Sequence, residues 1–280
     1  MSPVRFNKSG IKFRVERLMN IVRDSRHEGW VRTAYPDPTT GRPLIGGGFS
    51  LDICATEHPQ SNPLNPNSFV EPSSAQLWQA AGLDLAQLSA ILDRFDRRVE
   101  LWGKQELRRK VRAHELPPDI TEGEAMQLLR ISVLQAAHNA RAYSVNFDQL
   151  SASQQMALTQ LVYQMGVNLE EFTQFLSAIN GYSSDSQNKS AIHKLDWKAA
   201  QRDLVESDWA RRYTNRAIAV IAMFDPGYSM RPRQAERQVR NWIYPPAEPH
   251  PKNARSKKER TELARNSPWR PASKRRAKQG

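Results

Sequence analysis

Apolar residues recur at three- and four-residue steps along most of the chain before residue 245. Such spacing places them on one face of a helix, so the pattern predicts amphipathic helices. The stretch 84–112 predicts the longest helix, with a possible break at Gly103 before a basic continuation. Shorter helices are predicted over 11–26, 74–81, 122–141, 152–165, 170–179, 197–205, 209–224 and 232–241.

Two of these helices have a recognisable start in the sequence. Thr121 and Ser151 are each followed three residues later by Glu or Gln, at Glu124 and Gln154. This spacing is typical of a capping box, in which the two side chains satisfy free backbone N–H groups of the first turn. We therefore expect helices to begin just after both residues.

Residues 29–56 have a different character. Prolines, Asp37 and a run of three glycines at 46–48 exclude a helix and predict turns between short strands. This is the only sheet that the pattern predicts, because the Pro- and Asn-rich stretch 58–72 is typical of a surface loop. The predicted fold class is therefore α+β and predominantly helical, with a small β-hairpin region near the N-terminus.

Composition excludes several classes of protein. Cys54 is the only cysteine of the 280 residues, which excludes a disulfide within the chain, a cysteine zinc cage and a CxxC redox site. No apolar run is long enough for a transmembrane helix, and the first thirty residues lack the apolar core of a secretory signal. The six histidines are scattered without metalloprotease spacing. We expect no metal, no cofactor and no transmembrane segment.

Positive charge is concentrated at the C-terminal end. The formal net charge is +12, and residues 245–280 hold eleven Lys or Arg against three Glu. This Pro-rich stretch has few aliphatic residues, which predicts a disordered tail. The tail either only keeps the protein soluble or tethers it to an anionic envelope polymer or to nucleic acid. A second basic run, 94–112, indicates a solvated helix face or a docking surface, so a nucleic-acid-binding protein is one alternative function.

The hairpin region carries two carboxylates in unlike surroundings. Glu28 follows the first predicted helix and precedes Trp30, whereas Asp37 lies in a polar turn nine residues later. Hydrolysis of an acetal needs one carboxylic acid to protonate the leaving oxygen and one ionised carboxylate to activate water. Glu28 would be the acid and Asp37 the base. The Gly-rich strand that follows would allow a ligand to approach the backbone closely.

The order of residues around these carboxylates resembles a known enzyme family. The stretch reads Glu28-Gly29, then Ala-Tyr-Pro-Asp over 34–37, Gly41, and Leu-Ile-Gly-Gly-Gly-Phe over 44–49. It resembles the phage-type lysozymes, the endolysin muramidases of glycoside hydrolase family 24. The resemblance continues in 120–129, in 147–180 and in 209–224, so that it covers about 11–56 and 118–225.

This resemblance implies a lysozyme-like fold and cleavage of the β-1,4 bond between N-acetylmuramic acid and N-acetylglucosamine in peptidoglycan, by a monomer without metal or cofactor. Glu28 and Asp37 would be the catalytic pair. Arg216 matches an arginine that packs beside the catalytic glutamate, and Tyr35 would support the site. The resemblance places the following residues in the substrate cleft: Gly46, Gly48 and Phe49.

Two residues depart from the family pattern. Leu44 stands where the family has the threonine that holds the attacking water, and Phe49 stands where it usually has histidine. Either Thr39 or Thr40 supplies the hydroxyl, or Glu28 works alone. The second case would suit a lytic transglycosylase, whose substrate's own 6-hydroxyl attacks. A third reading is a catalytically impaired peptidoglycan-binding module.

The sequence divides on this basis into four parts. Residues 1–56 form the first helix and the catalytic hairpin region, 57–117 an insert of a loop plus helix, 118–244 the helical lobe, and 245–280 the basic tail. We expect synthesis in the cytoplasm without a signal peptide. The site of action would be the periplasm or cell wall, reached by phage lysis, in a virion or as a secreted effector.

Overall fold

The computed structural model describes residues 4–6, 8–24, 30–58, 65, 67–181 and 195–245. Contacts within the chain define two units, Met1–Ile243 and Tyr244–Gly280. Every element named below belongs to the first unit. The predicted tail from residue 246 onward and the predicted acid Glu28 lie outside the described residues.

A three-stranded antiparallel sheet occupies the predicted hairpin region. Its strands are β1 (Val31–Pro36), β2 (Pro43–Gly46) and β3 (Phe49–Ser50), in that order across the sheet. Tyr35 is paired with Leu44, and Ile45 with Phe49. The register between β1 and β2 shifts between Val31 and Tyr35. The sheet predicted over 29–56 is thus confirmed.

A second sheet corrects two predictions, that the hairpin region holds the only sheet and that 58–72 is entirely loop. β4 (Thr56–Glu57) and β5 (Val70–Glu71) form an antiparallel pair. Each strand has only two residues, which is too short to leave a period in the sequence.

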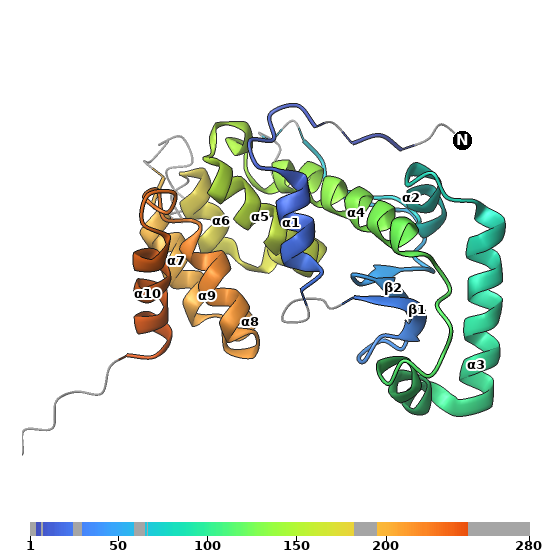
Figure 1. Ribbon diagram of the computed structural model, residues 1–280. Helices are drawn as coiled ribbons and strands as arrows, with labels where there is room; N and C mark the ends of the chain where they lie inside the picture. Colours follow the sequence, from blue (N-terminus) through green and yellow to red (C-terminus); the bar gives the residue numbers. More distant parts are fainter. Residues whose placement is uncertain are drawn as a thin grey trace, which may run out of the picture. The chain divides into compact units, whose positions relative to one another are not determined.

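Helices make up most of the described chain, as Figure 1 shows. Together with the small antiparallel sheets they confirm the α+β, predominantly helical class. The α-helices are α1 (Val15–Val22), α2 (Ser74–Ala80), α3 (Leu85–Arg112), α4 (Glu122–Tyr143), α5 (Ala152–Met165), α6 (Thr173–Asn180), α7 (Trp197–Glu206), α8 (Asp208–Arg212), α9 (Thr214–Ala222) and α10 (Pro232–Ile243). Two 3₁₀ helices span Phe147–Gln149 and Gly166–Glu171.

Local sequence signals explain several of these boundaries. Both predicted capping boxes are present, at Thr121 before α4 and at Ser151 before α5. The predicted break at Gly103 is also present, because this glycine has φ 71° and ψ 164° inside α3. Such angles are almost restricted to glycine. The helix therefore bends there, and its second part turns toward the strands of the hairpin (Figure 1).

Two predicted helices have different limits. The helix expected over 209–224 is wrong as a single element, because Tyr213 has φ −122° and ψ 45° and separates α8 from α9. No Gly or Pro in the sequence marks this break. The helix expected from residue 11 begins at Val15, after Arg14 in an extended conformation without a side-chain cap.

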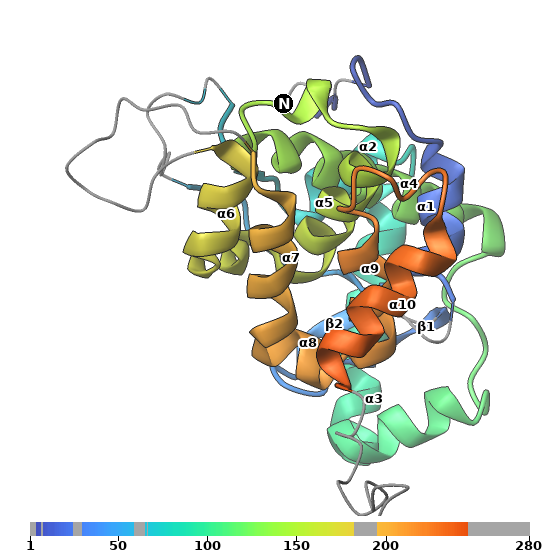
Figure 2. The same cartoon turned by 90° about the vertical axis from the view of Figure 1, so that its left-hand side faces the viewer.

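Helix α4 lies between two hydrophobic cores. Leu129 and Val133 pack with α5 and α9 in the helical core, whereas Leu128 and Ile131 pack with the sheet and α3. A helix that contacts protein on opposite faces is apolar around most of its circumference. α4 therefore joins the β-hairpin part to the helical lobe, while α10 covers α9 at the surface (Figure 2).

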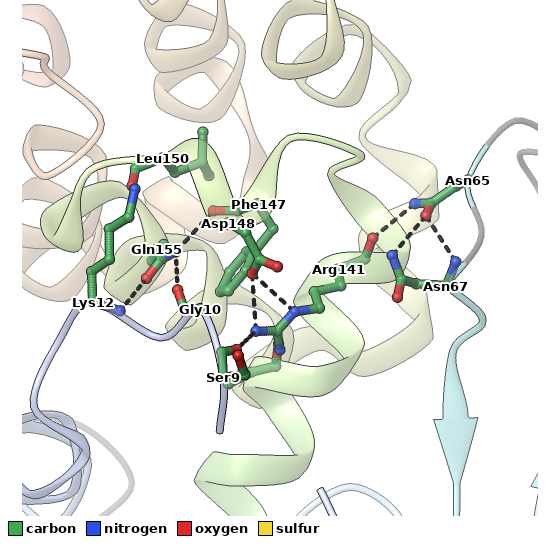
Figure 3. A network of polar contacts seen from close by, with 11 residues as sticks. Ser9, Gly10, Lys12, Asn65, Asn67, Arg141, Phe147, Asp148, Leu150 and Gln155 are labelled. Carbon is green, nitrogen blue, oxygen red and sulfur yellow. Dashed lines mark hydrogen bonds and ion pairs between the residues drawn. The ribbon is translucent and has the colours of Figure 1, made fainter. Parts of the chain in front are cut away.

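The segment before α1 is fastened to the helical lobe by a polar network (Figure 3). The buried guanidinium of Arg141 on α4 pairs with Asp148, with 2.9 Å between Nη2 and Oδ1, and donates to the carbonyl oxygen of Ser9. Gln155 on α5 donates to the carbonyl oxygen of Gly10 over 2.8 Å. Gly10 has φ 78°, and a Cβ there would come within 2.5 Å of Asp148. A larger residue at this position would therefore displace the Asp148 side chain and would also be strained by the positive φ.

Candidate active site

A cleft of about 670 Å³ opens between the sheet, α3 and the helical lobe, and we call it the Asp37 cleft. One wall comes from β1, β2 and the turns beside them. The other walls come from the second part of α3, the end of α5 and the residues around the end of α8. The described lining residues are Val31, Tyr35, Asp37, Pro38, Thr39, Leu44, Gly47, Gly48, Arg108, Val111, Arg112, Tyr163, Gln164, Arg212 and Tyr213.

The carboxylate of Asp37 organises the turn after β1. Its Oδ1 accepts hydrogen bonds from the backbone N–H of Thr39 over 2.9 Å and of Thr40 over 2.6 Å. The Thr40 hydroxyl donates to the same oxygen over 3.0 Å. Among the described residues none donates a hydrogen bond to Oδ2, so this oxygen remains available to the cleft.

These contacts keep Asp37 ionised. Partial burial raises the pKa of the Asp37 carboxyl, but the hydrogen bonds from Thr40 and Thr39 and the positive charge of Arg108 outweigh burial. The pKa is therefore lower than its ordinary value, because each of these contacts favours the charged form. A carboxylate in this state can accept a proton from water and cannot serve as a general acid near neutral pH.

The two threonines of the turn have different surroundings. The Thr40 hydroxyl donates to Asp37 and accepts the backbone N–H of Arg42 over 3.3 Å. Thr39 lines the cleft, and its hydroxyl has no hydrogen-bond partner among the described residues. Leu44 also lines the cleft, next to Tyr35 on the neighbouring strand. Of the two predicted water-holding residues, Thr39 is the one whose hydroxyl is free for a ligand.

Helix α5 closes the cleft from the helical lobe. The Tyr163 hydroxyl donates to the carbonyl oxygen of Gly47 over 2.7 Å and so joins α5 to the glycine-rich turn. Beside it, Trp209 donates from Nε1 to Oε1 of Gln164 over 3.1 Å. The central helix and the hairpin therefore meet along one side of the cleft.

Two arginines of α3 also line the cleft. Arg108 and Arg112 are four residues apart, so they lie on the same face of the helix after the bend at Gly103. Arg109 faces elsewhere and pairs with Glu106, with 2.6 Å between Nη2 and Oε1. The basic run 94–112 predicted a solvated helix face or a docking surface, and no signal in its spacing indicated that Arg108 and Arg112 share a cleft with Asp37.

A buried carboxylate holds α3 against the sheet. Asp119 has a side-chain exposure of 2% and pairs with Arg94 at 3.0 Å and with Arg98 at 2.8 Å. The same carboxylate accepts the backbone N–H of Ala34 in β1 over 2.9 Å. Part of the basic run thus has a structural role, and it fixes the helix that carries Arg108.

Glu28 lies outside the described residues, but the residues on both sides of its segment are held together. Arg23 follows α1 and is 3.7 Å from Oε1 of Glu122, at the start of α4. Trp30 donates from Nε1 to Oε2 of the same glutamate over 2.9 Å. The next residue, Val31, lines the Asp37 cleft. The residues that flank the segment 25–29 in the sequence are thus both in contact with Glu122.

The remaining predicted site residues occupy different positions. Arg216 is buried, and its guanidinium carbon is 5.3 Å from the ring centre of Tyr213, which lines the cleft. Gly48 lines the cleft, whereas Gly46 is not among its lining residues and has φ 64° in the strand pair with Val31. The side chain of Phe49 is buried against Trp78, with 6.1 Å between ring centres, so it packs in the core beneath the sheet.

Nothing in the described part of the chain indicates a metal or a membrane span. Among the described residues no group of three His, Cys, Asp or Glu side chains is arranged to hold a metal ion. Within the same ranges no helix is both long enough and apolar enough to cross a bilayer. The ionisable groups at the cleft, in the ranges described, are Asp37, Tyr35, Tyr163 and Tyr213 and the arginines 108, 112 and 212.

Comparison with known proteins returned no match, either to a family model or to a curated protein. The resemblance to phage-type lysozymes therefore stands on the quoted motifs alone.

Proposed function

We propose that the protein is a muramidase with a lysozyme-like fold, which cleaves the β-1,4 bond between N-acetylmuramic acid and N-acetylglucosamine in peptidoglycan. One observation carries the proposal. The ionised carboxylate of Asp37 lies in a cleft between a hairpin and helices, and Val31, three positions after Glu28 in the sequence, lines the same cleft. This substrate would place its action at the bacterial cell wall.

In the proposed reaction Glu28 is the general acid. Its carboxyl gives a proton to the glycosidic oxygen as the bond to the anomeric carbon breaks. Asp37 accepts a proton from a water molecule through Oδ2, and that water attacks the anomeric carbon. Thr39 is the proposed water-holding residue, since the Thr40 hydroxyl is engaged by Asp37. Attack from the opposite face inverts the configuration at the sugar.

Leu44 bears on the choice of mechanism. Its side chain lines the cleft, at the position where the resemblance to phage-type lysozymes would place a threonine, and it cannot form a hydrogen bond to water. Thr39, from the turn, offers a hydroxyl on the same wall of the cleft. Hydrolysis therefore depends on the Thr39 hydroxyl to hold the attacking water. If no water is held there, the alternative is a lytic transglycosylase, in which the substrate's own 6-hydroxyl attacks.

The proposal is tested by digesting purified peptidoglycan and identifying the fragments by mass spectrometry. The intact protein should release reducing muropeptides. Glu28→Gln should abolish release, and Asp37→Asn should lower the rate by about 10²–10⁴-fold, the usual contribution of a general base. Asp52→Asn is the matched control, because Asp52 is in the same region, interacts with Ser50 and does not line the cleft.

Each other outcome has a clear meaning. Fragments with 1,6-anhydro ends would replace the hydrolase with a transglycosylase. If the intact protein releases nothing, the muramidase proposal fails and a binding module remains. If Asp37→Asn and Asp52→Asn lower the rate of muropeptide release equally, Asp37 is not the general base.

A further inference from the structure

We propose that Arg108 and Arg112 of α3, together with Arg212, form a subsite of the Asp37 cleft that binds a carboxylate carried by the glycan strand. This inference rests on the proposed function, and it names the chemical feature of the substrate that the cleft selects. The stretch that supplies two of the three arginines, 57–117, lies outside the resemblance to lysozymes.

The charge of the lining residues supports an anionic ligand. Among the described residues of the cleft, three arginines accompany one aspartate. Asp37 already receives three hydrogen bonds from its own turn, so it does not need an arginine fork. In the described ranges no carboxylate forms an ion pair with Arg108, Arg112 or Arg212. An anionic ligand would supply the close carboxylate partner that these arginines lack in the described ranges.

Other arginines of α3 do form ion pairs with carboxylates, unlike those that line the cleft. Arg94 and Arg98 pair with Asp119, and Arg109 pairs with Glu106 and Glu115. Arg108 is half-buried, and its Nε is buried without a hydrogen-bond acceptor among the described residues. Arginines of α3 that stabilise the fold therefore form ion pairs with carboxylates. In the described ranges those that face the cleft form no such ion pair, although the charge of Arg108 lowers the pKa of Asp37.

The bend in the backbone of α3 brings two of these arginines to the cleft. The bend at Gly103 turns the second part of α3 toward the hairpin (Figure 1), and Arg108 and Arg112 of that part line the cleft. Arg212 and Tyr213 approach from α8, with the Arg212 guanidinium carbon 5.8 Å from the Tyr213 ring centre. The cleft thus combines guanidinium groups with tyrosine rings, which suits a sugar that bears a carboxylate.

Peptidoglycan supplies such a carboxylate in two positions. Intact strands carry it on the peptide stems, and strands freed of peptide carry it on the lactyl group of N-acetylmuramic acid. Neutral chitin oligosaccharides have the same sugar backbone without either. The guanidinium fork binds the carboxylate in each case, so the source is decided by comparison of the three ligands.

The test measures binding by the full-length chain carrying Glu28→Gln, so that the glycan is not cut. The probes are Gram-negative sacculi, which lack teichoic acid, the same material stripped of peptide by an amidase, chitin oligosaccharide, and a DNA duplex. R108Q/R112Q should weaken binding to sacculi about tenfold or more and leave the weaker binding to chitin oligosaccharide unchanged. R108K/R112K should restore part of the binding, because it keeps the charge but not the fork.

R97Q/R109Q is the matched control, since it removes two positive charges from exposed positions of the same helix. It should change binding to sacculi less than twofold, and the basic tail is identical in all variants. If R108Q/R112Q weakens binding only to intact sacculi, the subsite binds the carboxylate of the peptide stem. If it also weakens binding to strands stripped of peptide, the subsite binds the lactyl carboxylate as well.

Three results would overturn the inference. One is equal weakening of sacculus binding by R108Q/R112Q and by R97Q/R109Q. Another is that R108Q/R112Q weakens binding to chitin oligosaccharide as much as binding to sacculi. The third is that R108Q/R112Q weakens binding to DNA alone, which would favour nucleic acid as the ligand. Failure of the proposed function is separate. A protein that releases no fragments but loses sacculus binding in R108Q/R112Q would keep the anionic subsite and lose the muramidase assignment.

Discussion

The hydroxyl of Tyr163 on α5 donates a hydrogen bond of 2.7 Å to the carbonyl oxygen of Gly47, a residue 116 positions earlier in the chain. Both residues line the Asp37 cleft. A Cβ at position 47 would be 3.4 Å from the Tyr163 hydroxyl oxygen, so the two parts are in close contact. This bond connects the hairpin to the helical lobe beside the cleft.

Tyr163→Phe removes this connection while keeping the ring. We expect the free energy of unfolding to fall by about 0.5–1.5 kcal/mol, the usual net value of one hydrogen bond. The KM for peptidoglycan should rise because the glycine-rich turn is less firmly held. Urea unfolding and steady-state digestion measure the two effects. Tyr228→Phe, which removes a hydroxyl bonded to Glu236 away from the cleft, should leave the KM unchanged. A raised KM in both variants would contradict the expectation.

Asp119→Ala should be strongly destabilising. The substitution leaves Arg94 and Arg98 without their buried partner and the N–H of Ala34 without its acceptor. Removal of one member of a buried ion pair typically costs about 3–5 kcal/mol. Asp96→Ala, on the exposed face of α3, is the control and should stay within about 0.5 kcal/mol of the parent protein. Chemical unfolding of the parent protein and the two variants measures the effect. A fall in the free energy of unfolding below about 1 kcal/mol for Asp119→Ala would argue against a structural role of the contacts of Asp119 with Arg94, Arg98 and Ala34.

Thr40→Val should change how the protein responds to acid. The pKa of Asp37 is lowered in the folded state, so its contribution to stability is present above the unfolded pKa of about 3.9 and is lost as pH falls through the folded pKa. Loss of the Thr40 hydroxyl removes one bond to the ionised form, so the pKa rises toward its ordinary value. An NMR titration of the Asp37 carboxyl measures this directly.

The activity profile gives a second measurement of the same change. We expect the acid limb of the pH–rate curve to move to higher pH in Thr40→Val. Thr39→Val keeps the Thr40 hydroxyl bond and should leave that limb in place while lowering kcat, because its hydroxyl is the proposed holder of the water. An identical shift of the limb in both variants would refute this division of roles.

Gly103→Ala tests the bend in α3. Residue 103 has positive φ with extended ψ, and a Cβ there meets no atom within 4 Å, so the cost comes from the backbone conformation alone. We expect a loss of about 1–3 kcal/mol. Gly123→Ala is the matched control in the first turn of α4, where alanine should stabilise by up to about 1 kcal/mol. Thermal unfolding compares them, and a Gly103→Ala protein as stable as its parent would show that the bend is unstrained.

The sequence by itself determined the local features of this protein. Capping boxes at Thr121 and Ser151 marked two helix starts, and Gly103 marked the bend of α3. Prolines and glycines located the sheet, and the polar turn indicated the ionised state of Asp37. These features could be predicted because each depends on residues within about one helical turn of one another.

Tertiary structure alone decided which distant residues share the cleft. Tyr213 interrupts a helix with no breaker in its sequence, and β4 pairs with β5 through strands too short to show a period. Arg108 and Arg109 are adjacent and identical in the sequence, yet one lines the cleft and the other forms a surface ion pair. The direction of each side chain depends on how α3 packs against β1 and Asp119, and such long-range packing leaves no trace in local spacing.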